Sequence, residues 1–217
     1  LIFNKIDFEL TKSQKKVLKE IKDDISQPFA MNRLLQGDVG SGKTIIAVLA
    51  SAIAVSNDMQ VAVMAPTEIL AKQHYKSFKK LANHAKMSCA LLIGGMPARE
   101  RNKICRGLEK NKINIIVGTH ALLAKSIKFQ NLGLLIIDEE QHFGVQHKER
   151  LKQMRSDIHV LTLTATPIPR TLQLSLSGVR DLSIIGTPPV DRLAIRTYVS
   201  EFDAVTIREG LLREHYR

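Results

Sequence analysis

Apolar residues along the chain are arranged in two kinds of segment that alternate. Short runs such as Leu134-Leu-Ile-Ile137 are apolar at every position, whereas longer stretches of roughly 10–15 residues carry apolar residues at helical spacing. A continuous apolar run indicates a strand that is covered on both faces. The alternation therefore predicts an α/β fold in which a mostly parallel sheet has helices on both faces.

The expected elements follow from these segments. Apolar runs predict strands, and amphipathic or apolar stretches bounded by polar residues predict helices. Strands are expected at residues 33–36, 61–65, 89–93, 113–117, 134–137, 160–164 and 182–185, and helices at residues 12–25, 44–55, 69–81, 98–110, 145–154 and 170–177.

A domain boundary is expected near Gly186, because Pro188 and Pro189 exclude both a continuing helix and a central strand. A strand-like segment at 195–199 and a helix from about Asp203 follow it. We interpret residues 1–186 as one lobe, and residues 187–217 as a connector with the opening of a second lobe. The chain begins without Met and stops inside a helical pattern, so we expect it to belong to a longer protein.

The composition is that of a folded protein with a strong basic excess. Hydrophobic residues make up 44% of the 217 residues, which is sufficient for a core, and the formal net charge is +11. Such an excess favours a polyanionic partner, since neutralisation of phosphates drives non-specific binding to nucleic acid. The alternative is a solvated basic surface, because many of the Lys and Arg residues lie in helix patterns.

No segment is expected to cross a membrane. The longest apolar run, residues 45–55, has about half of the ~20 residues that a spanning helix needs. Cys89 and Cys105 have no metal-ligand spacing and are expected to be reduced thiols in a cytoplasmic protein. Four histidines likewise show no ligand spacing, and no metal role is expected for them: His74, His84, His159 and His215.

A phosphate-binding loop is expected at residues 37–44, which fit the pattern G-x-x-x-x-G-K-[ST] between a predicted strand and a predicted helix. Glycines allow the backbone to wrap around phosphates and to direct its N–H groups at them. Lys43 is expected to reach the β- and γ-phosphates of ATP, and the Thr44 hydroxyl to ligate Mg²⁺. The expected nucleotide-binding residues of this loop are Gly37, Asp38, Val39, Gly40, Ser41, Gly42, Lys43 and Thr44.

An acidic motif follows the apolar run at 134–137. Asp138 and Glu139 lie directly after this predicted strand, and ligands of open α/β sheets bind at the carboxyl ends of strands. Asp138 is expected to hold Mg²⁺ through its water shell, and Glu139 to polarise the attacking water. Together with Lys43 they are the expected catalytic residues; a solvated acidic turn is the alternative.

The loop and the acidic motif, in this order, resemble the core of superfamily 2 helicases, which implies a RecA-like P-loop NTPase fold. Further short motifs occur in the order of that family. Phe8 and Gln14 resemble the segment that reads adenine, with Ile6 as the alternative to Phe8 beside the adenine ring. Thr164-Ala-Thr166 resembles the motif that couples ATP hydrolysis to the nucleic acid. The motifs that resemble those gripping the nucleic-acid backbone contain Pro66, Thr67, Gly94, Gly95, Thr119 and His120.

The last third of the chain resembles two families of bacterial DNA motor, the branch-migration fork helicases and the transcription-repair coupling factors. Both share Thr164-Ala-Thr-Pro-Ile-Pro-Arg170, and residues 177–192 are more similar to the coupling factors. The resemblance implies a translocase on double-stranded DNA that displaces stalled RNA polymerase and recruits excision-repair proteins. It also adds Gln141 and Arg170 to the nucleotide-binding residues. The acidic motif ends in Gln141-His142, where many relatives have His and Arg.

Two other functions compete with a DNA motor. A small-molecule kinase would need a lid and an acceptor pocket, which the sequence does not indicate. A nucleotide-gated module that binds DNA without turnover would not need Asp138 and Glu139. In motors of this type a second RecA-like lobe supplies arginines to the γ-phosphate, whereas Arg170, Arg180 and Arg192 belong to the first lobe or its connector. We therefore expect the chain alone to hydrolyse ATP very slowly.

Overall fold

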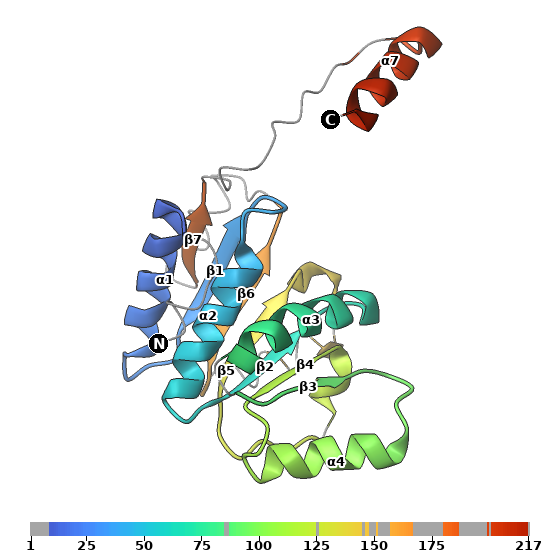
Figure 1. Cartoon of the computed structure of the whole chain (residues 1–217). Coiled ribbons are helices and arrows are strands. Elements are labelled where there is room, and N and C mark those ends of the chain that lie inside the picture. The colour runs from blue at the N-terminus through green and yellow to red at the C-terminus, as the bar shows by residue number, and fades with distance from the viewer. Residues whose placement is uncertain are drawn as a thin grey trace.

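The computed structural model describes residues 9–84, 87–124, 126–144, 146–147, 151, 157–166, 180–186, 199 and 201–216. Seven strands of this part form one parallel sheet in the order β3-β4-β2-β5-β6-β1-β7 (Figure 1). Each expected strand is present with ends within two residues of those predicted, and the predicted α/β fold is confirmed. The strands are β1 (Asn32–Gly37), β2 (Gln60–Met64), β3 (Cys89–Leu92), β4 (Ile115–Gly118), β5 (Leu132–Asp138), β6 (His159–Thr164) and β7 (Asp181–Ile185).

The helices also follow the sequence pattern. Those expected at 12–25, 44–55, 69–81 and 98–110 are present with ends within three residues of the prediction. The helix expected at 170–177 lies outside the described residues, and of the one at 145–154 only residues 146, 147 and 151 are described, all of them helical. The described helices are α1 (Lys12–Ile25), α2 (Lys43–Ser56), α3 (Glu68–His84), α4 (Ala98–Glu109) and α7 (Ala204–His215), with the 3₁₀ turns η2 (His120–Leu123) and η3 (Glu140–His142).

Helix α1 begins at a capping box. The Thr11 hydroxyl accepts a hydrogen bond from the N–H of Gln14, and the Gln14 side chain accepts one from the N–H of Thr11. Both N–H groups would otherwise lack a partner at the start of the helix. Val17, Ile21 and Ile25 recur at helical spacing and are buried. This stripe holds α1 against the sheet, while its lysines face solvent.

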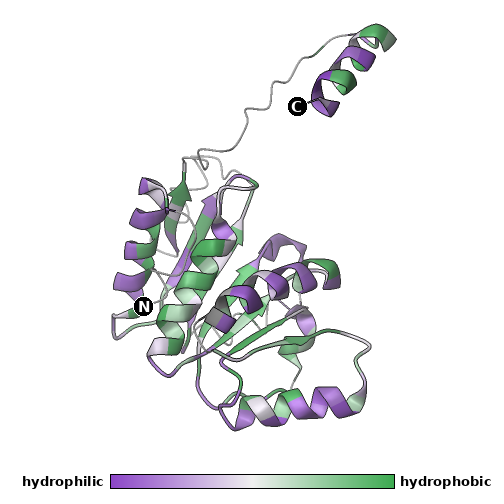
Figure 2. Ribbon diagram, in the orientation of Figure 1, coloured by the Kyte–Doolittle hydropathy of each residue, from purple (hydrophilic) through white to green (hydrophobic). Residues whose placement is uncertain are grey.

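The two faces of the sheet bury separate hydrophobic clusters. Val61 and Val63 of β2 belong to the cluster that includes residues of α1, α2 and α3, whereas Ala62 and Met64 belong to the cluster that includes Leu108 of α4. The alternation is the two-residue period of a strand. Figure 2 shows the apolar strands inside and polar residues on the outer sides of α1, α3 and α4. Helices therefore cover both faces, as predicted.

Helix α2 is enclosed by its neighbours. It lies between α1 and α3 on one face of the sheet (Figure 1), and its residues 46–52 are all buried. A helix that is apolar on all sides is expected only where it is covered all round. Because Lys43 is its first residue, the packing of α2 also fixes the end of the phosphate-binding loop.

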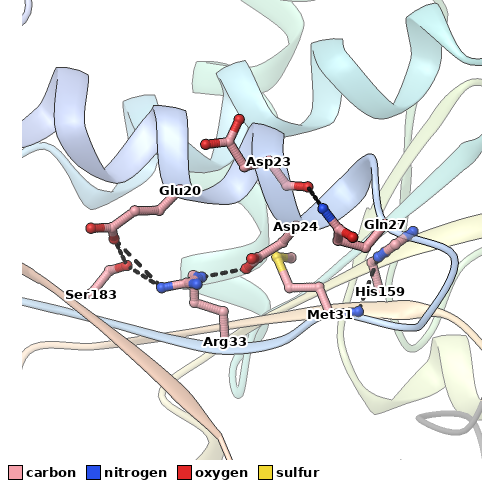
Figure 3. A network of polar contacts seen from close by, with 8 residues as sticks. All are labelled: Glu20, Asp23, Asp24, Gln27, Met31, Arg33, His159 and Ser183. Atoms are coloured by element: carbon pink, nitrogen blue, oxygen red, sulfur yellow. Dashed lines mark hydrogen bonds and ion pairs between the residues drawn. The ribbon is translucent and has the colours of Figure 1, made fainter.

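A buried arginine joins α1 to two strands. The Arg33 guanidinium donates to Asp24 Oδ2 at 2.6 Å and to Ser183 Oγ at 2.8 Å, with Glu20 Oε2 at 3.5 Å (Figure 3). Arg33 is only 8% exposed, and a buried charge is tolerated only when it is paired and hydrogen-bonded. The network ties α1, through Glu20 and Asp24, to β1 and β7.

Helix α7 follows the expected start near Asp203, whose carboxylate accepts hydrogen bonds from the N–H groups of Val205 and Thr206. No residue of α7 is buried. The division of the chain at residue 186 stays a prediction, because residues 187–198 are not described. In the described part of the chain, no helix has the length and apolar character needed to cross a membrane.

Candidate nucleotide-binding site

The predicted phosphate-binding loop joins the end of β1 to the start of α2. Gly40 and Gly42 have φ angles of 76° and 94°, in the left-handed region that side chains disfavour. A Cβ on Gly42 would also lie only 2.3 Å from Gln14 Nε2. The loop therefore needs glycine at Gly42 for two reasons, its backbone angle and the space taken by Gln14.

Lys43 is folded back onto the loop. Its Nζ donates to the carbonyl oxygens of Gly37 at 2.6 Å and Asp38 at 3.0 Å. Burial lowers the pKa of Lys43, while the nearby carboxylates of Asp138, Glu139 and Asp38 oppose that shift. The structure thus brings the lysine and the acidic motif into one site. Phosphate oxygens would form stronger, charge-assisted hydrogen bonds with Nζ than these carbonyls do.

Gln14 links α1 to the loop. It is 3% exposed, its Nε2 donates to the Ser41 carbonyl at 2.9 Å, and its Oε1 accepts from the N–H of Thr11 at 2.9 Å. One side-chain amide thus holds both the helix cap and the loop. The role of Gln14 in reading adenine stays a prediction, and Phe8, its expected companion, lies outside the described residues.

Asp138 ends β5 and contacts a residue that no sequence motif singled out. Its Oδ2 lies 2.7 Å from Nε2 of His74 on α3. His74 is 8% exposed and the Asp138 side chain 13% exposed. An ionised carboxylate only accepts hydrogen bonds, so Nε2 carries the proton of this pair. The sequence contains one indication of this contact, since His74 is a polar residue on the same face of an amphipathic helix as the apolar residues Ala71 and Phe78.

Glu139 adopts a left-handed backbone conformation, with φ of 47°, which is rare for a residue with a side chain. Its Oε1 accepts from the N–H of Ala165 at 2.8 Å and its Oε2 from Thr164 Oγ1 at 3.3 Å. Gln141 Nε2 also donates to Oε2, and the N–H of Thr166 donates to Thr164 Oγ1. The acidic motif is therefore in direct contact with the predicted coupling motif.

The next residue, Glu140, forms an ion pair with Arg180, with Arg180 Nη2 and Glu140 Oε2 2.9 Å apart. Arg180 lies directly before β7, so the pair connects η3 to the edge of the sheet. This contact engages the Arg180 guanidinium within the lobe. Arg170 and Arg192, the other arginines considered from the sequence, lie outside the described residues.

The residues at the site fit a magnesium ion that is coordinated mainly by water and phosphate oxygens. Thr44 lies in the first turn of α2 and Asp138 at the end of β5, and both offer the oxygen ligands that Mg²⁺ prefers. Among the described residues, no group of three or more His, Cys, Asp or Glu side chains could hold a metal ion. Mg²⁺ bound to one or two protein groups and substrate phosphates does not need such a cage.

The residues predicted to contact nucleic acid follow three neighbouring strands, β2, β4 and β3. Because parallel strands end at one edge of the sheet, they lie along a single edge. Thr67 caps α3, since its hydroxyl accepts from the N–H of Leu70 at 3.3 Å. The Glu68 carboxylate lies beside Gly94. The predicted residues are Pro66 and Thr67 after β2, Gly94 and Gly95 after β3, and Thr119 and His120 after β4.

The segment after β4 differs from the expectation in one respect. Thr119 is 3% exposed, which leaves little of its side chain for a DNA strand to touch, whereas His120 is exposed and its ring lies 4.9 Å from that of His147. Gly118, just before them, is required by space, because a Cβ there would lie 2.2 Å from the Leu92 carbonyl oxygen. The contact role of these residues stays a prediction.

The predicted phosphate-binding loop, acidic motif and coupling motif thus lie at the carboxyl ends of β1, β5 and β6, which are neighbours in the sheet. Open α/β sheets bind their ligands at this edge. Fold and site together define a RecA-like lobe of the P-loop NTPase class. The family model "DEAD/DEAH box helicase" matches residues 11–175, and the chain belongs to this family.

Several known proteins are similar to the chain over most of its length. The transcription-repair-coupling factor of Escherichia coli K12 is 48% identical over 217 residues, which are 100% of this chain and 19% of that protein. The protein of the same name from Bacillus subtilis 168 is 46% identical over 207 residues, or 95% of this chain and 18% of that protein. The chain therefore spans about a fifth of the length of these relatives.

A solved structure shows the same fold. RecG, in a structure described as bound to a three-way DNA junction, is 37% identical with a TM-score of 0.84, over 98% of this chain and 28% of that chain. The helicase MrfA is 19% identical with a TM-score of 0.69 over 97% of this chain, and this likeness concerns the fold alone.

Proposed function

We propose that the chain is the ATP-binding lobe of an ATP-dependent motor that translocates on double-stranded DNA, and that the whole protein is a transcription-repair coupling factor. The proposal is supported by family membership and by the identity of 46–48% to proteins of that name. The intact protein would displace stalled RNA polymerase and recruit excision-repair proteins through parts outside these residues. Residues 1–186 would form the first lobe, and residues 187–217 the connector to a second RecA-like lobe.

The observation that carries the proposal is the contact of Glu139 with Thr164 and Ala165. A carboxylate that polarises the attacking water must be positioned relative to the γ-phosphate. Here the carboxylate is held by residues at the end of β6, so a shift of that segment on DNA binding would move the group that activates water. A lobe that only bound nucleotide would not need this connection.

Each residue of the site has a defined task in this proposal. Lys43 leaves the carbonyls of Gly37 and Asp38 and binds the β- and γ-phosphates of ATP, and the loop N–H groups hold the phosphate oxygens. Thr44 and Asp138 would hold Mg²⁺, which would supply positive charge to the phosphates. Glu139 accepts the proton of the attacking water.

The proposal is tested by two substitutions in the full-length protein. Lys43→Ala should weaken ATP binding, because it removes a charge-assisted contact to the phosphates. Glu139→Gln should keep binding but reduce DNA-stimulated hydrolysis by about 10²–10⁴-fold, the usual contribution of a general base. Nucleotide titration and steady-state ATPase assays with and without duplex DNA measure both effects.

A matched control is Lys16→Ala on α1, whose side chain is 79% exposed and which should leave both quantities unchanged. Wild-type ATP affinity in Lys43→Ala would contradict the assignment of the loop. Nucleotide-dependent DNA binding without any hydrolysis in the unmodified protein would favour a binding module without turnover.

A branch-migration fork helicase is the second candidate, favoured by the similarity to RecG over 98% of the chain. The two functions differ in substrate. A coupling factor should release RNA polymerase halted on duplex DNA in an ATP-dependent reaction, whereas a fork helicase should convert a model replication fork to a four-way junction. Measuring both reactions with one preparation of the full-length protein distinguishes them.

A further inference from the structure

Among the side chains of helix α3 whose burial is described, His74 is the polar residue within a buried apolar stripe. Ala71, Phe78 and Ala82 recur at helical spacing and are at most 1% exposed, and His74 lies in the same stripe at 8% exposure. A buried polar group is costly unless it is hydrogen-bonded. Its partner is Asp138 Oδ2, 2.7 Å from Nε2.

The imidazole is held in place by the helix and by an aromatic neighbour. The Phe78 ring, one turn further along α3, meets it edge to face, with centroids 6.5 Å apart and planes at 80°. The first turn of α3 is itself anchored, because the N–H of Ala71 donates to the Thr67 carbonyl and the Thr67 hydroxyl caps the helix. His74 therefore approaches Asp138 from a fixed position rather than from a loop.

The contact decides which way the Asp138 carboxylate faces. A hydrogen bond from Nε2–H to an ionised carboxylate is charge-assisted and directional, and here it is made to Oδ2. The Lys43 ammonium attracts the same carboxylate. Without His74, the Asp138 carboxylate would be free to turn away from the magnesium position.

We infer that His74 is a positioning residue that holds the Asp138 carboxylate in the orientation required for magnesium–nucleotide binding. The inference deepens the proposed function and rests on it. Groups that orient a metal-binding carboxylate commonly change metal affinity by about 10–100-fold when they are removed.

The test compares two amides of different length in the full-length protein. His74→Gln places an amide N–H near the position of Nε2, whereas His74→Asn places it near Nδ1, too far from Asp138. Mn²⁺ affinity is measured by electron paramagnetic resonance in the complex with a non-hydrolysable ATP analogue. His74→Asn should weaken Mn²⁺ binding by about tenfold or more, and His74→Gln should stay within about threefold of wild type.

Two further measurements distinguish a positioning role of His74 from a loss of the folded structure. ADP binding without divalent metal should be the same in both variants and in wild type, because the loop and Lys43 remain intact. If His74→Asn does not fold, His74→Leu, which lacks the donor but preserves apolar packing, should show the same loss of Mn²⁺ affinity. Wild-type Mn²⁺ affinity in His74→Asn or His74→Leu overturns the inference. A loss of Mn²⁺ affinity in His74→Gln equal to that in His74→Asn also overturns it.

The outcome is independent of the motor activity. A wild-type protein without DNA-stimulated ATPase activity would refute the proposed function, whereas Mn²⁺ binding to the nucleotide complex would still decide the role of His74. In an active protein, the Mg²⁺ concentration for half-maximal ATPase activity should rise about tenfold in His74→Asn, while the rate at saturating Mg²⁺ falls less.

Discussion

At the scale of single residues, the partly buried His159 gives the fold a pH dependence. Its Nδ1 accepts a hydrogen bond from the N–H of Met31 at 3.1 Å, and burial lowers the pKa of His159 below its usual value of 6.5, with Asp24 opposing the shift. The unfolded chain therefore binds the proton more readily than the folded chain. This contribution to stability is complete above about pH 6.5 and is lost as the pH falls toward the folded-state pKa.

We expect the free energy of unfolding to fall as the pH is lowered below about 6.5, because the unfolded chain then binds a proton at His159 that the folded chain binds less tightly. His159→Asn keeps an acceptor near the Nδ1 position but does not titrate. Urea denaturation of the two proteins across this range measures the difference. Identical pH dependence in wild type and His159→Asn would contradict the prediction.

The sequence predicts some site residues better than others for a physical reason. The loop at 37–44 and the pair Asp138–Glu139 are contiguous, and the strand and helix around them determine their positions. The contact between His74 and Asp138 spans 64 positions, and it depends on where α3 crosses the sheet. Periodicity shows that His74 lies on the buried face, but it contains no information on which strand end that face meets.

At the scale of elements, the Arg33 network should contribute substantially to stability. Arg33→Met keeps most of the aliphatic packing but removes the cation beside Asp24 and leaves Glu20 with only its long contact to the exposed Lys16. The carboxylate side chains are 31% and 23% exposed, so solvent reduces the cost below that of a fully buried pair. We expect a loss of about 2–3 kcal/mol in the free energy of unfolding, compared with about 3–5 kcal/mol for complete burial.

Lys16→Met is the matched control for this prediction, because Lys16 pairs with the same Glu20 at 3.9 Å but is 79% exposed. Exposed pairs contribute little, so its effect should stay below about 0.5–1 kcal/mol. Thermal or urea unfolding of the two variants provides the comparison. Equal effects of the two substitutions would show that burial does not set the strength of these ion pairs.

The elements themselves are well predicted, whereas their arrangement is not. Strands such as β5 are recognised because they are apolar on both faces, and α1 because its capping box and its apolar stripe agree. The 3₁₀ turns η2 and η3 contain four and three residues, too few to show a period. The strand order also has no local signal, since it depends on which side of the sheet each crossover takes.

At the scale of the whole molecule, the 217-residue chain should bind ATP but hydrolyse it very slowly. In the proposed site the loop, Lys43 and Mg²⁺ would supply positive charge on one side of the γ-phosphate, and Arg180 is engaged with Glu140. An arginine from a second lobe contributes about 10³–10⁵-fold to the rate in such motors. Steady-state ATPase rates of the chain and of the full-length protein, each with duplex DNA, measure this difference.

The control for slow hydrolysis is nucleotide affinity, which should be similar in the two proteins because the loop is complete in both. Loss of ATP binding by the chain alone would indicate misfolding. Comparable turnover of the chain and the full-length protein would show that the lobe contains its own catalytic arginine, and the two-lobe motor would have to be abandoned.

The position of β1 in the sheet has a consequence for how the chain is made on the ribosome. β1 is synthesised well before its two neighbours in the sheet, β6 and β7, and the contacts Met31–His159 and Arg33–Ser183 span 128 and 150 residues. At about 5–20 residues per second, β1 waits roughly 6–30 s with both edges unpaired. During that interval the unpaired edges of β1 favour aggregation of the nascent chain.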